Sequence, residues 1–117
     1  MKMKIQSESI PFDEFYAQHP VDTILIPKSY GLDGAIVQQL LLSFALNLIK
    51  DLIVYVVKKI SEKGKKEEPK GDVTFVFENG IRVCIPLSEF DNADNVFKKV
   101  TAVAERIELE YGKCDSL

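Results

Sequence analysis

The chain opens with alternating apolar and polar residues, MKMKIQ. A period of two is typical of a strand with one buried face, so we expect a strand over about residues 2–8. A short helix is expected next, starting near Pro11 with Asp13 and Glu14 in its first turn. The β-branched segment VDTILIP predicts a second strand over about 22–26, which Pro27 should end.

The longest apolar stretch predicts one helix from about Gly34 to Glu62. Asp33 could cap its start, and Gly64 lies where a left-handed residue would end it. On a helical projection the polar side chains gather in one stripe, made of Ser43, Asn47, Lys50, Asp51 and Lys58. The remaining part of the helix circumference, roughly 240°, is almost wholly apolar. This is far wider than the ~100° apolar stripe of a surface helix.

Such a helix is expected to find a partner. About 27 residues at 1.5 Å each span about 40 Å, more than strands of five residues can cover. An apolar overhang normally marks an interface, so we expect a homo-oligomer or a protein partner bound through this helix. The expected interface lies opposite the polar stripe and consists of Leu41, Ala45, Leu48, Leu52, Tyr55 and Val56.

Two alternatives remain open for this helix. It could be the central core helix of a monomer, fully covered by its own sheet. It could also be a single membrane span over 35–57, which would make the chain a membrane-attached accessory. For that span the apolar residues offer about −4 to −8 kcal/mol, whereas Lys50 and Asp51 together cost about 5 to 7 kcal/mol, so that insertion comes out near zero.

The clearest local pattern is DVTFVFENGIRVCIP, in which Asn79-Gly80 between two β-rich runs indicates a hairpin. A three-residue loop, Glu78-Asn79-Gly80 with Gly80 at positive φ and a bulge there, places one apolar set on a single face: Val73, Phe75, Phe77, Ile81, Val83 and Ile85. The other face then carries Thr74, Val76, Arg82 and Cys84. A two-residue loop would mix polar and apolar residues on both faces, so we favour the longer loop.

An apolar stripe at three- and four-residue intervals predicts a final helix over about 91–111, with Ser88 or Asp91 as its cap. The expected fold is therefore α+β with two layers, a sheet of about four strands carrying one long central apolar helix and a C-terminal helix. Residues 1–117 are expected to form a single domain, in which 61–72 is a charged linker.

Composition excludes some functions. A net charge of −3 argues against a nucleic-acid binder, which needs a concentrated basic face. Cys84 and Cys114 are thirty residues apart, which fits free thiols better than a disulfide framework or metal ligands. The segment MKMKIQSESI lacks the apolar run of a secretory signal. We therefore expect a cytoplasmic protein, or a membrane-associated one if 35–57 spans a bilayer.

No catalytic, cofactor-binding or metal-binding motif is present in the sequence. His19 is the single histidine and precedes Pro20, a position typical of a turn. A reactive thiol at Cys84 beside Arg82 is conceivable, although a half-exposed strand face explains both residues. We therefore expect no enzyme and no cofactor, with a small ligand-binding domain or enzyme as a further alternative.

The order of elements over about residues 1–107 resembles the effector-associated constant components of bacterial conflict systems. The resemblance rests on KMKIQ, FDEFY, TILIP, YGLDGA, the long apolar segment ending in basic residues, and DVTFVFENGIRVCIP before the last helix. It implies a non-enzymatic accessory that accompanies variable effectors, with no family active site to transfer. The expected function is thus a protein-interaction or assembly module.

Overall fold

The computed structural model of the chain describes residues 2–30, 34, 36–62 and 69–115. These residues form an α+β fold in which one antiparallel sheet has the strand order β2-β3-β1-β4-β5. The strands are β1 (Lys2–Ser7), β2 (Thr23–Tyr30), β3 (Ile36–Ser43), β4 (Asp72–Phe77) and β5 (Arg82–Pro86). The helices are α1 (Asp13–Gln18), α2 (Leu46–Glu62), the 3-10 helix η1 (Leu87–Asp91) and α3 (Ala93–Asp115).

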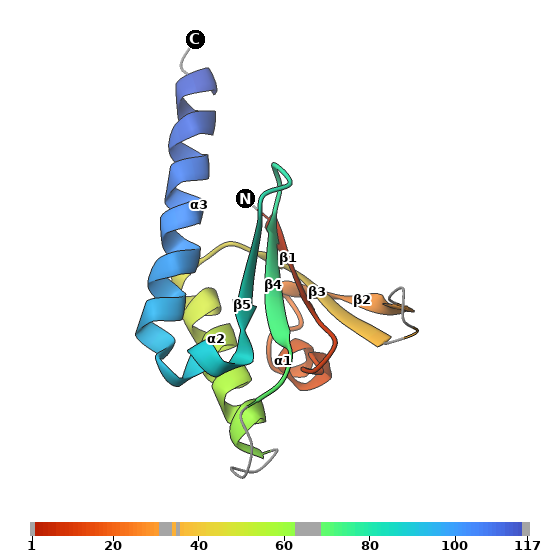
Figure 1. Ribbon diagram of the computed structural model, residues 1–117. Coiled ribbons are helices and arrows are strands. Elements are labelled where there is room, and N and C mark those ends of the chain that lie inside the picture. The colour runs from red at the N-terminus through yellow and green to blue at the C-terminus, as the bar shows by residue number, and fades with distance from the viewer. Residues whose placement is uncertain (1, 31–33, 35, 63–68, 116–117) are drawn as a thin grey trace.

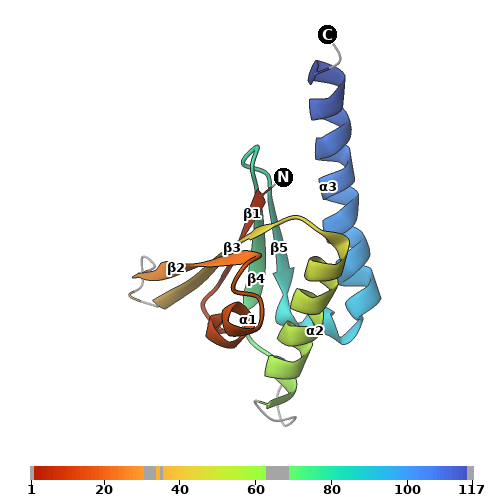
Figure 2. The same cartoon turned by 180° about the vertical axis from the view of Figure 1, so that it is seen from behind.

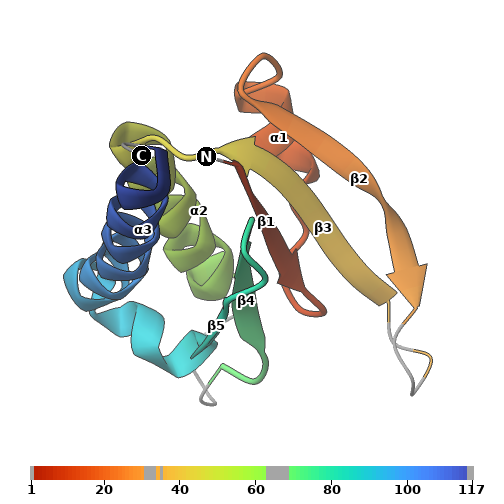
Figure 3. The same cartoon turned by 90° about the horizontal axis from the view of Figure 1, so that it is seen from above.

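The helices lie on one side of the sheet. Figure 1 shows the strands in front, and Figure 2, seen from behind, shows α1 and α2 in front of them. Seen from above, α2 and α3 run side by side along one end of the sheet, and α1 lies behind β3 (Figure 3). The C-terminal half of α3 projects past the sheet, which gives a body 54 Å long and 29 Å wide. The other face of the sheet is left open by every described helix.

Alternate strand residues build the core. Met3 and Ile5 of β1 point to the helices, as do Leu40 and Leu42 of β3 and the side chains Val73, Phe75 and Phe77 of β4, all at most 2% exposed. Helix α2 covers them with Leu48, Ile49, Leu52, Ile53 and Val56. Each such side chain contributes about 1.5–3 kcal/mol by leaving water, so this layer supplies most of the stabilising burial.

The β4–β5 hairpin has the expected register. Val73 pairs with Ile85 and Phe75 pairs with Val83. The Phe77 amide donates to the carbonyl of Ile81, so Glu78, Asn79 and Gly80 form a three-residue loop. Gly80 has a φ of +88°, the left-handed conformation that glycine adopts without strain. The prediction of this loop is confirmed.

The prediction of one helix from Gly34 to Glu62 is wrong. Residues 36–43 are strand β3, and α2 begins only at Leu46. The strand is paired on both sides, with β1 and with β2, so the sheet satisfies its backbone groups as fully as a helix would. Because α2 has 17 residues, it is about 26 Å long instead of ~40 Å.

The alternative of a single helical membrane span over 35–57 is contradicted, because a strand and a helix share this segment. Among the described residues, no helix combines the length and the apolar character that a membrane crossing requires. Four residues of the expected polar stripe lie on α2 and are exposed, namely Asn47, Lys50, Asp51 and Lys58. The sheet has five strands instead of about four, and β3 is the additional one.

Smaller differences have local causes. Pro27 does not end β2, since this is an edge strand and its register shifts between Ile26 and Ser29. The cap of α3 is Asn92, whose side-chain oxygen accepts a hydrogen bond from the Asn95 amide at 3.3 Å, while Ser88 and Asp91 belong to η1. The suggested cap Asp33 and the suggested end Gly64 lie outside the described residues.

The expected charged linker over 61–72 includes residues 63–68, which also lie outside the described residues. Helix α2 continues to Glu62, and β4 begins at Asp72. Strand β4 pairs with β1, with Ile5 opposite Phe75. Residues before and after the linker therefore belong to one sheet.

Candidate functional site: the open face of the sheet

The six residues expected to form an interface do not share one helix face. Leu48, Leu52, Tyr55 and Val56 are at most 7% exposed, since α2 uses this side to cover its own sheet. Leu41 lies on β3, and Ala45 lies in the connection between β3 and α2. A continuous helical interface through these residues is therefore absent from the described part of the chain.

Part of the apolar surface that lacks a cover lies on the open face of the sheet, where Ile24 is exposed, and other exposed apolar side chains lie elsewhere, such as Val54 of α2 and Leu109 of α3. Strand alternation directs every second side chain away from the helices, and the strand registers align these side chains in rows. One row runs across the sheet through Ile24, Leu41, Lys4, Val76 and Arg82. The next row runs through Ile26, Gln39, Gln6, Thr74 and Cys84.

The first row is apolar over much of its length. Ile24 is 57% exposed, and Leu41 and Val76 are partly buried by their neighbours on the same face. Lys4 lies between Leu41 and Val76, where its aliphatic stem can cover apolar surface while its ammonium group reaches solvent. This row therefore offers apolar contact with a cation at its centre.

Two hydrogen bonds join Arg82 of the first row to Gln6 and Gln39 of the second row. The Arg82 Nη2 donates to Gln6 Oε1 at 3.1 Å, and Gln6 Nε2 donates to Gln39 Oε1 at 3.2 Å. These bonds link β5, β1 and β3 over the face of the sheet and hold the guanidinium group against it. A guanidinium has five N–H donors, so Arg82 can still donate to an approaching carboxylate.

The open face carries both cationic and acidic side chains. Its strand side chains include Lys2, Lys4 and Arg82 but a single carboxylate, Asp72. Two further carboxylates lie at this face. Glu78 lies at the hairpin loop and accepts a hydrogen bond from the Lys2 amide at 2.7 Å. Glu8 lines a hollow of the face together with Asp72 and Arg82. The first row therefore holds the positive charges of Lys4 and Arg82, whereas the three carboxylates lie outside this row.

The Cys84 thiol is exposed on this face, beside Arg82 as expected from the hairpin. Burial by neighbouring atoms raises the pKa of the Cys84 thiol, and the Asp72 carboxylate raises it further. A hydrogen bond with Thr74 opposes this change, and the guanidinium of Arg82 opposes it more weakly. The thiol is thus protonated at neutral pH, a poor state for a nucleophile.

His19 ends α1 and has structural contacts. Its ring lies 4.5 Å from the Phe15 ring, and its carbonyl accepts a hydrogen bond from Thr23 Oγ1 at 2.7 Å. Its Nε2 is 4.0 Å from Asp51 Oδ2, too far for a hydrogen bond. His19 therefore has a structural role: it joins the end of α1 to β2 and lies beside α2.

Tyr55 and Lys59 form a polar clamp between α1 and α2. The Tyr55 hydroxyl donates to the Pro11 carbonyl, and burial raises the pKa of this phenol. Lys59 Nζ lies 2.8 Å from Glu14 Oε2 and 5.6 Å from the Tyr55 ring centre. The hydrogen bond and charge of Lys59 lower the pKa of Glu14, and the same hydrogen bond raises the pKa of Lys59. These contacts fix α1 against α2.

Among the described residues, no group of three or more His, Cys, Asp or Glu side chains is arranged to hold a metal ion. Comparison with protein-family models, curated proteins and solved structures gave no match for this chain. Its function is therefore inferred from the surfaces described above. The open face combines apolar and charged side chains in register.

Proposed function

We propose that this chain is a non-enzymatic interaction module that binds an acidic, apolar protein segment across the open face of its sheet. The observation that carries this proposal is the row Ile24, Leu41, Lys4, Val76 and Arg82, in which two cationic side chains lie among three apolar ones on a face that no described helix covers. An amphipathic partner segment with Glu or Asp beside Leu or Phe matches this order.

The dimensions of the face favour a single segment. Five strands at about 4.8 Å and five residues at about 3.4 Å give a face of roughly 24 by 17 Å, about 400 Å². This is about half of the ~800 Å² per partner that a standard interface buries. One helix of about 16 residues would lie across all five strands, since its rise is 1.5 Å per residue and its diameter is ~10 Å.

The charges disfavour a second copy on this face. Strand β1 is the third of five strands, so its Lys4 lies near the middle of the sheet. Symmetric stacking of two such faces about their centre would bring the Lys4 side chains of both copies together. Like charges at an interface oppose association, whereas an acidic partner is attracted and steered to the face.

This proposal moves the expected interface from a helix to the sheet and keeps the expected class of function. Membership of the effector-associated constant components stays a prediction, as does homo-oligomer formation. An accessory that accompanies variable effectors would need a docking surface, and the open face supplies a candidate for it.

The test uses two synthetic peptides of about 16 residues, one built from Glu, Leu and Ala and the other with Lys in place of each Glu. Titration of the ¹⁵N-labelled chain should show saturable shifts of the open-face amides with the acidic peptide. The double variant Lys4→Glu/Arg82→Glu should bind it at least about tenfold more weakly, because two attractive pairs become repulsive. The matched control Lys50→Glu/Lys98→Glu changes two exposed lysines of α2 and α3 and should bind normally.

Equal binding of both peptides would contradict the proposal, as would an equal loss of affinity in the control variant. Light scattering supplies an independent outcome. A dimer that Leu41→Asp dissociates would show that this face binds a second copy, which would replace the acidic partner.

A further inference from the structure

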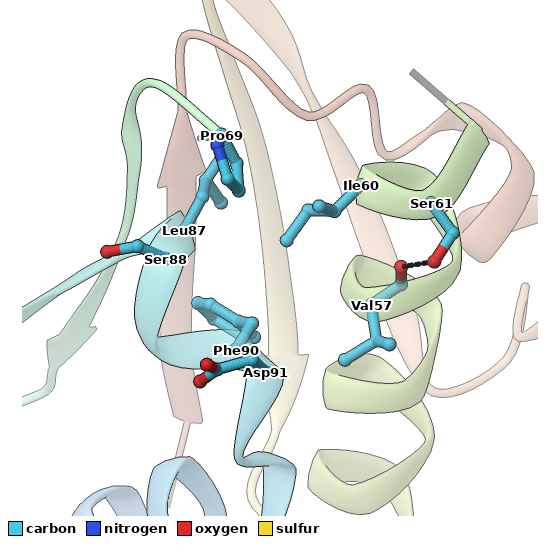
Figure 4. A pocket seen from close by; sticks show the side chains of 8 residues that line it. All are labelled: Val57, Ile60, Ser61, Pro69, Leu87, Ser88, Phe90 and Asp91. Atoms are coloured by element: carbon cyan, nitrogen blue, oxygen red, sulfur yellow. Dashed lines mark hydrogen bonds between the residues drawn. The ribbon is translucent and has the colours of Figure 1, made fainter. Parts of the chain in front are cut away.

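A second surface feature lies on the helix side of the molecule, between the last turns of α2 and η1. Figure 4 shows it from close by. The residues that line it are Val57, Ile60, Ser61, Pro69, Leu87, Ser88, Phe90 and Asp91. We call it the α2–η1 groove. Its volume is about 310 Å³, at the lower end of the range for small-molecule sites.

The groove is apolar inside. Leu87 and Phe90 are at most 2% exposed and form its floor on the η1 side. Val57 and Ile60 are partly buried and face them from α2 (Figure 4). An apolar group placed between these walls would lose contact with water on several sides, which is the main source of affinity in such sites.

Asp91 supplies charge at the groove. Its carboxylate is exposed and has no ion-pair partner among the residues that the structure describes. The neighbouring carboxylates differ, since Glu89 pairs with Lys99 at 2.7 Å and Glu62 pairs with Lys59 at 3.3 Å.

The other polar groups at the groove are consistent with a cation. The Ser61 hydroxyl already donates to the Val57 carbonyl at 3.1 Å, within its own helix. The groove lies at the C-terminal end of α2, where the last carbonyl groups carry a partial negative charge. The Asp91 carboxylate and this helix end therefore both favour positive charge.

We infer that the α2–η1 groove binds a small apolar amine, with its apolar group between Ile60 and Phe90 and its ammonium group at Asp91. The volume corresponds to about ten water molecules at ~30 Å³ each, which suits one aromatic ring with a short amino-alkyl chain. The groove lies on the opposite side of the sheet from the open face, so this inference does not depend on the proposed function.

Three probes with the same ring separate the contributions: 2-phenylethylamine, the neutral 2-phenylethanol and the anionic 3-phenylpropionate. Each is titrated into the ¹⁵N-labelled full chain. The amine should give saturable shifts at the amides of Ile60, Ser61, Ser88 and Asp91. The alcohol should bind more weakly at the same place, and the anion should bind most weakly.

Asp91→Asn keeps the shape of the side chain and removes its charge. Its affinity for the amine should fall about threefold to fivefold, as expected for one solvent-exposed ion pair, while its affinity for the alcohol stays unchanged. Asp94→Asn is the matched control, since Asp94 is an exposed carboxylate of α3 outside the groove lining. It should leave both affinities unchanged.

Three results would overturn the inference. The first is an absence of saturable shifts at the groove with the amine, and the second is equal binding of the three probes. The third is an Asp91→Asn variant that binds the amine as the original chain does. A short Lys-Phe peptide that shifts the same amides when free phenylethylamine does not would assign the groove to a polypeptide partner instead.

Discussion

Two neighbouring leucines of β3 should respond very differently to truncation. Leu40 points to the helices and is fully buried, whereas Leu41 points to the open face and is only partly buried. Leu40→Ala is expected to destabilise the fold strongly, and Leu41→Ala only slightly. A helix from Gly34 to Glu62 would reverse this order, because Leu40 would lie beside the polar stripe and Leu41 on the apolar side.

The size of the effect follows from burial. Leu40→Ala removes three carbon atoms, each contributing about 0.8 kcal/mol by leaving water, which gives about 2.4 kcal/mol. Leu40 is opposite Ile5 of β1 and Leu25 of β2, so the surrounding sheet cannot collapse freely into the space. A residual cavity of ~50 Å³ adds about 1 kcal/mol, so the free energy of unfolding should fall by about 3–4 kcal/mol. For Leu41→Ala the loss should stay below about 1 kcal/mol.

Urea unfolding, followed by circular dichroism, measures both variants against the original chain. The slope of the free energy with urea should be unchanged, so that the midpoint reports stability directly. A loss for Leu41→Ala that equals or exceeds the loss for Leu40→Ala would refute the assignment of residues 36–43 to a strand.

Three further predictions concern a turn, a cap and an ion pair. Gly71→Ala should destabilise the fold by at least about 1–2 kcal/mol in urea unfolding, because Gly71 has a φ of +106° and a new Cβ would collide with the Ser9 side chain. Asn92→Ala should lower the unfolding free energy by about 1 kcal/mol through loss of the α3 cap; an unchanged midpoint would place the cap elsewhere. Because Lys59 lowers the pKa of Glu14, the stability from this pair is present above the ordinary pKa of 4.5 and is lost as the pH falls through the lowered value. Glu14→Gln should therefore be less stable than the original chain at pH 7 and equally stable at pH 2; a pH-independent difference would contradict this.

Much of the fold could be predicted where side-chain period and turn chemistry agreed. The β4–β5 register followed from Gly80 and from one apolar set that a slip would scatter. Strand β1 was recognisable from its period of two, and α3 from its apolar stripe. In each case the element has one buried face, which the sequence displays directly.

The segment IVQQLLLSFAL was misleading for a physical reason. Strand β3 lies inside the sheet and keeps Leu41 partly buried on the open face, so Leu40, Leu41 and Leu42 form an apolar run without alternation. No glycine or proline separates β3 from α2, since only Phe44 and Ala45 connect them. Only the length of the expected helix argued against it, because 29 residues exceed the usual 8 to 20.

Only half of the candidate site could be predicted from the sequence. The hairpin correctly placed Thr74, Val76, Arg82 and Cys84 together on its less apolar face. The other half of the open face depends on β3, which brings Leu41 between Ile24 and Lys4. These pairings join segments far apart in the chain, and a local pattern contains no information about them.

The most direct test of this account is whether residues 36–43 form a strand between β1 and β2, because the open face exists only in that case. Nuclear Overhauser contacts in the labelled chain measure this in solution. A strand at this position should give backbone contacts from Leu40 to Ile5 and to Leu25, since opposed residues in an antiparallel sheet have Cα atoms about 4.5–5.5 Å apart. Contacts between residues three apart along 36–43, with none to β1 or β2, would show a helix and contradict the account.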